Sequence, residues 1–193
     1  MDLVDRIWGI FLKPAAALEH ITAKKPVQEG LLLYTAVVTL TIIINQGIQM
    51  LEPIEEMLNI PASFLWLFLI LGIIFSLLFL LATAGFLSLI SEIVYKQGNS
   101  LGLLAGLCFA ILPGALGALL QYGSLLLGIE WLGVLFSVIT LIWVIVLQIM
   151  AVKTALGLSN GQALLIYFMP PLIIAVMIIA FVLAAAFSIP QLF

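Results

Sequence analysis

Five long stretches of this chain contain no Asp, Glu, Lys, Arg or His, and they limit its fold more than any other feature. They are residues 31–50, 63–90, 101–127, 131–152 and 163–187. A helix needs about 20 apolar residues to cross the roughly 30 Å hydrocarbon layer of a bilayer. In lipid a helix satisfies its backbone hydrogen bonds within one segment. The pattern predicts an all-α polytopic integral membrane protein, a bundle of five transmembrane helices.

The composition excludes the water-soluble classes of protein. Of 193 residues, 65% are hydrophobic and only 8% are charged. A soluble domain of this size still exposes roughly 30% of its unfolded surface, which so apolar a chain cannot cover with polar groups. The net charge of −3 offers no basic field for nucleic acid. The single cysteine, Cys108, permits neither an intramolecular disulfide nor a cysteine metal cluster.

The basic residues predict the orientation of the five spans. Lys and Arg near span ends are retained on the cytoplasmic side of a membrane. All six basic residues lie on the same predicted side. Four precede the first span, Arg6, Lys13, Lys24 and Lys25; Lys96 lies between spans two and three, and Lys153 between spans four and five. The opposite side holds the acidic residues of 52–56 and Glu130. We therefore expect the N-terminus in the cytoplasm and the C-terminus outside.

Residues 1–25 form a separate cytoplasmic segment in this interpretation, and residues 26–193 form a single five-helix domain. Polar and apolar positions alternate over 2–13 with the period of an amphipathic interfacial helix, and no cleavage site of a removable signal peptide follows. We expect its charges to face water and its aromatic rings to enter the acyl boundary. A second short helix is expected from Pro14 to about Ile21. Candidate cytoplasmic docking residues are Trp8, Phe11, Lys13, Pro14, Lys153 and Ser159, and the alternative is a tethered arm without a partner.

Small residues recur along the third span and predict close helix packing there. Its glycines recur at intervals of about four residues or twice that, at Gly102, Gly106, Gly114 and Gly117. Helices in lipid associate through such faces, so this span is expected at the centre of the bundle. Pro113 is expected to kink it, because proline removes a backbone hydrogen bond. Pro170 and Pro171 are expected to act in the same way near the inner end of the last span.

The fourth span carries a candidate polar face inside the membrane. Ser137, Thr140 and Gln148 recur there at helical spacing. Hydrogen bonds to neighbouring helices are the default role of such groups in lipid. A binding site for a solute is the alternative. Both interpretations remain open from the sequence.

The sequence offers no catalytic machinery. Proton transfer and metal chemistry within a membrane usually need Asp, Glu, Lys, Arg or His side chains, and none of these lies within the five stretches. The one histidine, His20, has no partner nearby for metal binding or acid–base work and is expected on the solvated surface. We therefore name no catalytic, cofactor-binding or metal-binding residue, and expect no enzyme and no cofactor.

Several motifs carry a family resemblance over about residues 6–187. They are IWGIFLKP at 7–14, ALEHI at 17–21, Pro26 before the first span, FAILPG at 109–114, and KTALGLS at 153–159 followed by Ala163 and Pro170. In these features the chain resembles the YIP family, the Ypt/Rab-interacting membrane proteins with a Yip-one domain. The resemblance implies a five-helix membrane protein with a cytoplasmic N-terminus.

Eukaryotic YIP members are associated with Rab GTPases and vesicle traffic, but only about 30 residues precede the first span here. The chain resembles the compact prokaryotic type, which implies a prokaryotic cytoplasmic membrane and does not favour a Rab-type GTPase partner. The first hypothesis is a non-enzymatic protein that organises or binds other membrane proteins, copies of itself or membrane lipids. The alternative is a transport module for a small solute or lipid, with a midplane site between kinked helices.

Overall fold

The computed structural model describes residues 2–51 and 65–188, and all its regular elements there are helices. Two short helices come first, α1 (Leu3–Leu12) and α2 (Pro14–Lys24). The others are α3 (Val27–Leu51), α4 (Leu65–Tyr95), α5 (Ser100–Ala110), α6 (Leu112–Leu126), α7 (Glu130–Leu156) and α8 (Asn160–Ser188). Five spans are long and apolar enough to cross a membrane, with α5 and α6 together forming the third. The predicted all-α, five-span fold is confirmed.

Several helices extend beyond the apolar stretches. The first span begins at Val27 rather than residue 31, and α4 continues to Tyr95 rather than residue 90. A helix longer than the hydrocarbon layer tilts or continues into the interface. α7 continues past Lys153 to Leu156 and is capped by Gly157, whose φ of 64° is one that glycine adopts without strain. The acidic residues expected at 52–56 lie outside the described residues.

The third span is divided at Ile111, where α5 ends and α6 begins. Pro113 lies in the first turn of α6. A backbone N–H at this position has no acceptor within the helix, so its absence in proline costs no hydrogen bond. The backbone N–H of Gly114 donates to the carbonyl of Ile111 at 2.8 Å. The chain therefore starts a new helix at this point instead of continuing the old one.

α5 lies at the centre of the molecule. It touches α2, α3, α4 and α7, and residues 102–110 are all buried. A methyl group added at Gly106 would lie 3.0 Å from Cβ of Ala151 on α7. A methyl group at Gly30 on α3 would lie 3.1 Å from Cβ of Cys108. Small residues thus let two neighbouring helices approach α5 closely.

α1 and α2 form a helical hairpin docked against the bundle. Ile10, Leu18 and Ile21 are completely buried. The ring of Phe11 meets Trp143 of α7 edge-on, with centroids 5.7 Å apart. α2 continues to Lys24, beyond the expected end near Ile21.

One expectation for this segment is wrong. Arg6 was expected to face water, but its side chain is buried and forms an ion pair with Glu29 in the first turn of α3. The amphipathic period does place Arg6 on the polar side of α1. The hairpin packs through α2 against α5 and α7, and in that position the Arg6 side chain meets Glu29 at the start of the first span.

His20 is half-buried rather than fully solvated, and its Nδ1 atom is enclosed without a hydrogen-bond partner in the described residues. Desolvation lowers the pKa of His20, and the positive charges of Lys24 and Arg6 lower it further. The imidazole is therefore held toward its neutral form.

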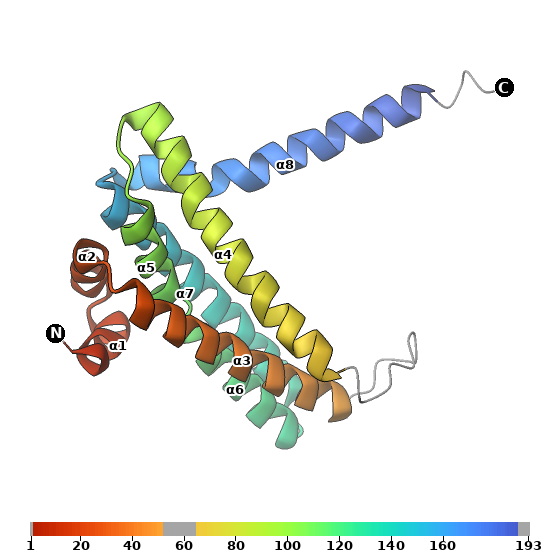
Figure 1. The fold of residues 1–193 in the computed structure, drawn as a ribbon. Helices are drawn as coiled ribbons and strands as arrows, with labels where there is room; N and C mark the ends of the chain where they lie inside the picture. The colour runs from red at the N-terminus through yellow and green to blue at the C-terminus, as the bar shows by residue number, and fades with distance from the viewer. Residues whose placement is uncertain (1, 52–64, 189–193) are drawn as a thin grey trace.

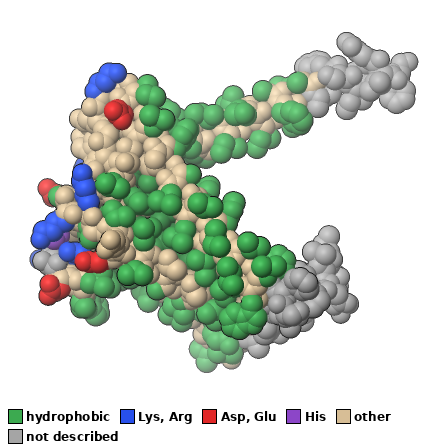
Figure 2. Space-filling model, viewed as in Figure 1, with side chains coloured by type: hydrophobic (Ala, Val, Ile, Leu, Met, Phe, Trp, Pro, Cys, Tyr) green, Lys and Arg blue, Asp and Glu red, His purple; other side chains and the backbone are tan. Residues whose placement is uncertain are grey.

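The helices diverge from one end of the molecule. Figure 1 shows α8 extending away from α4, while α3, α6 and α7 run together. Figure 2 shows basic and acidic side chains gathered at the end where α1, α2 and the α4–α5 connection lie. The loop that holds Lys96 and the last turn of α7, which holds Lys153, share this end, since Nδ2 of Asn99 donates to the carbonyl of Ala155 at 3.0 Å.

Candidate functional site

A cavity of about 470 Å³ lies where α8 diverges from α4. We call it the fork pocket. Leu80 and Leu87 of α4, Leu107 of α5, and Pro170 and Ile174 of α8 contribute to its lining. A cavity of this volume lies in the range of small-molecule and cofactor sites.

The two ends of α8 differ in burial and so create the fork pocket. At its start, Ala163 and Ile166 are completely buried against the bundle. Beyond Pro170 and Pro171, which α8 includes without interruption, residues 172–183 are all exposed. The pocket lies at this change, with packed helix on one side and exposed helix on the other.

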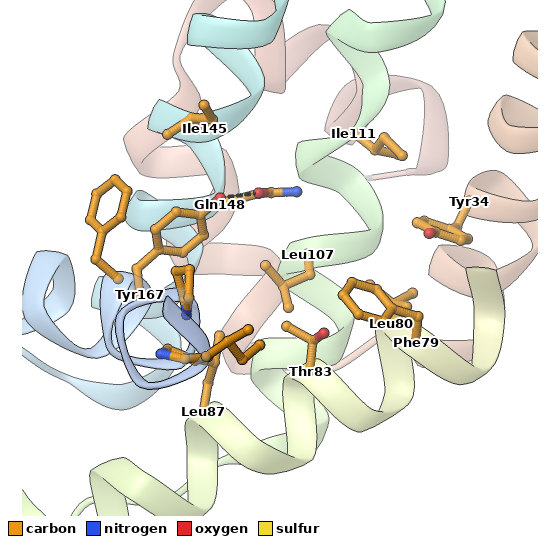
Figure 3. A pocket seen from close by; sticks show the side chains of 14 residues that line it. Tyr34, Phe79, Leu80, Thr83, Leu87, Leu107, Ile111, Ile145, Gln148 and Tyr167 are labelled. Carbon is orange, nitrogen blue, oxygen red and sulfur yellow. Dashed lines mark hydrogen bonds between the residues drawn. The ribbon is translucent and has the colours of Figure 1, made fainter. Parts of the chain in front are cut away.

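A few polar groups enter this apolar cavity. The Tyr167 hydroxyl donates to Oε1 of Gln148 at 2.6 Å, and this bond is drawn in Figure 3. The amide nitrogen of Gln148 points away from Tyr167 in the same view. The Tyr34 hydroxyl donates to the carbonyl of Ser76 at 3.4 Å, and Thr83 lines the wall formed by α4. The pocket thus combines apolar walls with hydrogen-bonding groups from α3, α4, α7 and α8.

The structure divides the predicted polar face of α7. Ser137 and Thr140 line a second cavity of about 300 Å³, which we call the polar cavity, whereas Gln148 lies in the fork pocket. The Ser137 hydroxyl is within hydrogen-bonding distance of Oε1 of Gln121 on α6, at 3.1 Å. Thr140 donates to the carbonyl of Phe136 in its own helix at 2.8 Å. The division arises because α7 packs against both α6 and α8.

The glycines singled out in the third span all have near neighbours. A Cβ at Gly102 would lie 2.7 Å from the carbonyl of Thr22, and one at Gly117 would lie 2.9 Å from Cβ of Thr140. At Gly114 the nearest atom belongs to Val144, at an ordinary 3.7 Å. These positions therefore differ in how much room they leave for a side chain.

The candidate docking residues do not form one exposed set. Trp8, Lys13, Lys153 and Ser159 are exposed. Phe11 and Pro14 are partly buried, and Phe11 contacts Trp143 within the bundle.

Sequence reasoning missed Tyr34, Thr83 and Tyr167 as pocket residues. The two tyrosines lie near the inner boundaries of apolar stretches, where tyrosine is common simply because its ring suits the membrane interface. Thr83 had one available signal, since it is a polar residue within an apolar span. Nothing in the sequence indicates that these residues meet Gln148 in one cavity.

Together these features define an all-helical integral membrane protein of five spans. In the parts of the chain that are described, no three His, Cys, Asp or Glu side chains are grouped to hold a metal ion. A family model described as the Yip1 domain matches residues 8–183. The chain therefore belongs to the Yip1-domain family, as its motifs predicted. No curated protein and no solved structure matches it.

Proposed function

We propose that this protein is a non-enzymatic membrane organiser that binds lipid in the fork pocket. The observation that carries the proposal is an apolar cavity of about 470 Å³ beside an exposed stretch of α8. In a bilayer, the exposed residues of α4 and α8 around the cavity meet lipid tails. An acyl chain is the ligand that such a cavity meets most often in this setting.

The polar groups suggest how the acyl lipid is oriented. Oε1 of Gln148 accepts from Tyr167, which leaves the two N–H groups of its amide as donors. Gln148 lies eight residues, about 12 Å, from the end of α7 at Leu156. This depth is a little below the interfacial layer, which is roughly 5 to 8 Å thick on each side. We infer that the Gln148 amide donates to an ester carbonyl while the chain occupies the apolar part of the pocket.

A bulky side chain in the fork pocket tests lipid binding. Ile174 lines the pocket, so Ile174→Trp should occupy it, whereas the adjacent Ile173 does not line it. We expect native mass spectrometry of the purified protein to show several-fold less retained lipid for Ile174→Trp than for Ile173→Trp. Gln148→Leu should also weaken retention of ester lipids, by the few-fold that corresponds to one hydrogen bond. Equal retention by all these variants would contradict the proposal.

A membrane organiser also needs a surface for other proteins, and we assign it to the exposed half of α8. Residues 172–183 are exposed and apolar. A second copy of the chain or another membrane protein is the partner we infer for this half. Crosslinking in native membranes from a cysteine at Met177, with the Cys108→Ala background, tests this inference. Recovery of monomer alone would contradict it.

The polar cavity favours a second candidate function, passage or binding of a small uncharged solute. Asn45, Gln121 and Thr140 line it together with apolar residues. Uncharged solutes need hydrogen-bonding groups but no buried charge. Under this alternative, Gln121→Leu changes solute uptake into proteoliposomes, whereas Ile174→Trp does not. Uptake unchanged by Gln121→Leu would remove the alternative.

A further inference from the structure

A separate hollow of about 290 Å³ lies where α4 gives way to α5. We call it the α4–α5 hollow. Its lining includes Lys25, from the junction of α2 and α3, and Glu92, from the last turns of α4. In the described part of the chain, Arg6 and Glu29 form the ion pair, and Lys25 and Glu92 do not form one with each other although both line the hollow. Two opposite charges are thus available there for a ligand.

Asn99 holds the connection beside the hollow in place. Its backbone N–H donates to the Ser88 hydroxyl oxygen at 3.0 Å. Its side-chain nitrogen donates to the carbonyl of Ala155 at 3.0 Å, and its side-chain oxygen accepts from the N–H of Gly102 at 3.1 Å. These bonds tie the start of α5 to α4 and α7, so they fix the backbone of the α4–α5 connection beside the hollow.

The start of α5 supplies donors suited to a phosphate. The N–H groups of Gly102 and Leu103 donate to Asn99, but the first N–H groups of α5, at Ser100 and Leu101, have no acceptor in the described chain. The Ser88 hydroxyl, which accepts from Asn99, keeps its own hydrogen for another partner, and Ser88 is 94% buried, since its exposed fraction is 6%. These donors, the helix dipole and Lys25 all favour an anionic group.

Glu92 argues against a simple anion as the ligand. Its carboxylate repels a second negative charge but attracts an ammonium group. The carboxylate is close to the connection, since a Cβ at Gly98 would lie 3.0 Å from Oε2 of Glu92. Leu101 lines the hollow and is 55% exposed, and Ile93 and Val94 beside Glu92 are also exposed. The hollow therefore combines free N–H donors and a lysine, a carboxylate, and an apolar edge.

We propose that the α4–α5 hollow binds the phosphoethanolamine headgroup of a membrane lipid. The phosphate lies at the start of α5 beside Lys25 and Ser88, and the primary ammonium donates to Glu92. The acyl chains leave past Leu101. This site is independent of the fork pocket and goes beyond the function proposed for it.

Headgroup selectivity tests the proposal. The full chain is exposed to equal amounts of phosphatidylethanolamine, phosphatidylcholine and phosphatidylglycerol, and bound lipid is measured by native mass spectrometry. We expect phosphatidylethanolamine to bind several-fold more than the other two lipids. Phosphatidylcholine has no ammonium hydrogen for Glu92, and phosphatidylglycerol has no ammonium at all. Lys25→Gln should weaken phosphatidylethanolamine binding about tenfold, the value of one charge-assisted hydrogen bond.

Glu92→Gln gives the sharper result, because it should reverse the order of lipids. Loss of the carboxylate removes the attraction for the ammonium and the repulsion of a further anion, so phosphatidylglycerol should gain relative to phosphatidylethanolamine. Lys24→Gln and Glu19→Gln are matched controls, since both residues are exposed and neither lines the hollow. Equal binding of the three lipids by the wild type, or a Glu92→Gln order identical to that of Glu19→Gln, would overturn the proposal.

Two further arms separate the alternatives. Soluble glycerophosphoethanolamine should compete only weakly with phosphatidylethanolamine, because it lacks acyl chains. If it binds as tightly as the lipid does, the assignment of the site to a lipid is overturned. Ile174→Trp should leave the headgroup order unchanged even though it blocks the fork pocket. Loss of selectivity in Ile174→Trp would mean that the selectivity belongs to the fork pocket, and would overturn the assignment to the α4–α5 hollow.

Discussion

At the scale of single residues, Arg6 shows what one charge does in so apolar a chain. Its side chain, on α1 of the docked hairpin, is buried, whereas its partner, Glu29, is half exposed. A buried charge is costly unless it is paired and hydrogen-bonded. The ion pair therefore joins α1 to α3 when the hairpin is docked.

Removing the carboxylate at Glu29 should loosen the amino-terminal hairpin. Glu29→Gln leaves the Arg6 guanidinium buried without a counter-charge. The free energy that holds the hairpin in its docked position should fall by about 1 kcal/mol. This value is small for an ion pair with a buried guanidinium, because Glu29 reaches solvent. Faster tryptic cleavage near Lys13 measures it. Glu19→Gln makes the same charge change at an exposed position, so identical cleavage rates for the two variants would contradict the expectation.

At the scale of elements, the contact of α6 with α7 depends on small residues. Gly117 faces Thr140 so closely that a Cβ would lie 2.9 Å from the threonine Cβ, whereas Gly123 of the same helix has open space beside it. The sequence pattern identified Gly117 but offered no means of separating it from Gly123. The difference arises from which side of α6 meets α7.

Alanine at these two glycines should therefore have opposite effects on stability. We expect Gly117→Ala to lower the free energy of unfolding by about 1 to 3 kcal/mol, because Thr140 or α7 must move. Gly123→Ala should be neutral or should stabilise α6 by up to about 1 kcal/mol, because alanine is the better helix former. Unfolding in dodecyl sulfate measures both, and equal losses in the two variants would contradict the close-contact interpretation.

At the scale of the whole molecule, charges gather at one end while apolar side chains cover the diverging helices (Figure 2). Lys96 and Lys153 share the charged end, because Asn99, in the same loop as Lys96, bonds to Ala155 in the last turn of α7, close to Lys153. This arrangement agrees with the basic-residue count in the sequence. We propose that this end faces the cytoplasm of a prokaryotic cell and that α8 runs toward the outside.

Cysteine labelling in intact cells tests this orientation. Lys153 and Glu130 are exposed and lie near opposite ends of α7. A membrane-impermeant maleimide added outside should label Glu130→Cys and should label Lys153→Cys only after the membrane is opened. The wild type is the background control, since its Cys108 is completely buried. Labelling of Lys153→Cys in intact cells would place the charged end outside.

The sequence by itself determined the number of spans and the helical class, and it predicted a kink at Pro113, near which the structure divides the third span into two helices. These properties follow from local causes, namely the length of apolar stretches, backbone hydrogen bonding in lipid and the missing N–H of proline. Only the tertiary structure decided that Arg6 is buried, that Gln148 separates from Ser137, and that Lys25 shares a hollow with Glu92. Each of these depends on which sides of two helices meet. Predominantly apolar spans carry too few polar side chains to indicate this, so the packing of the helices decides it.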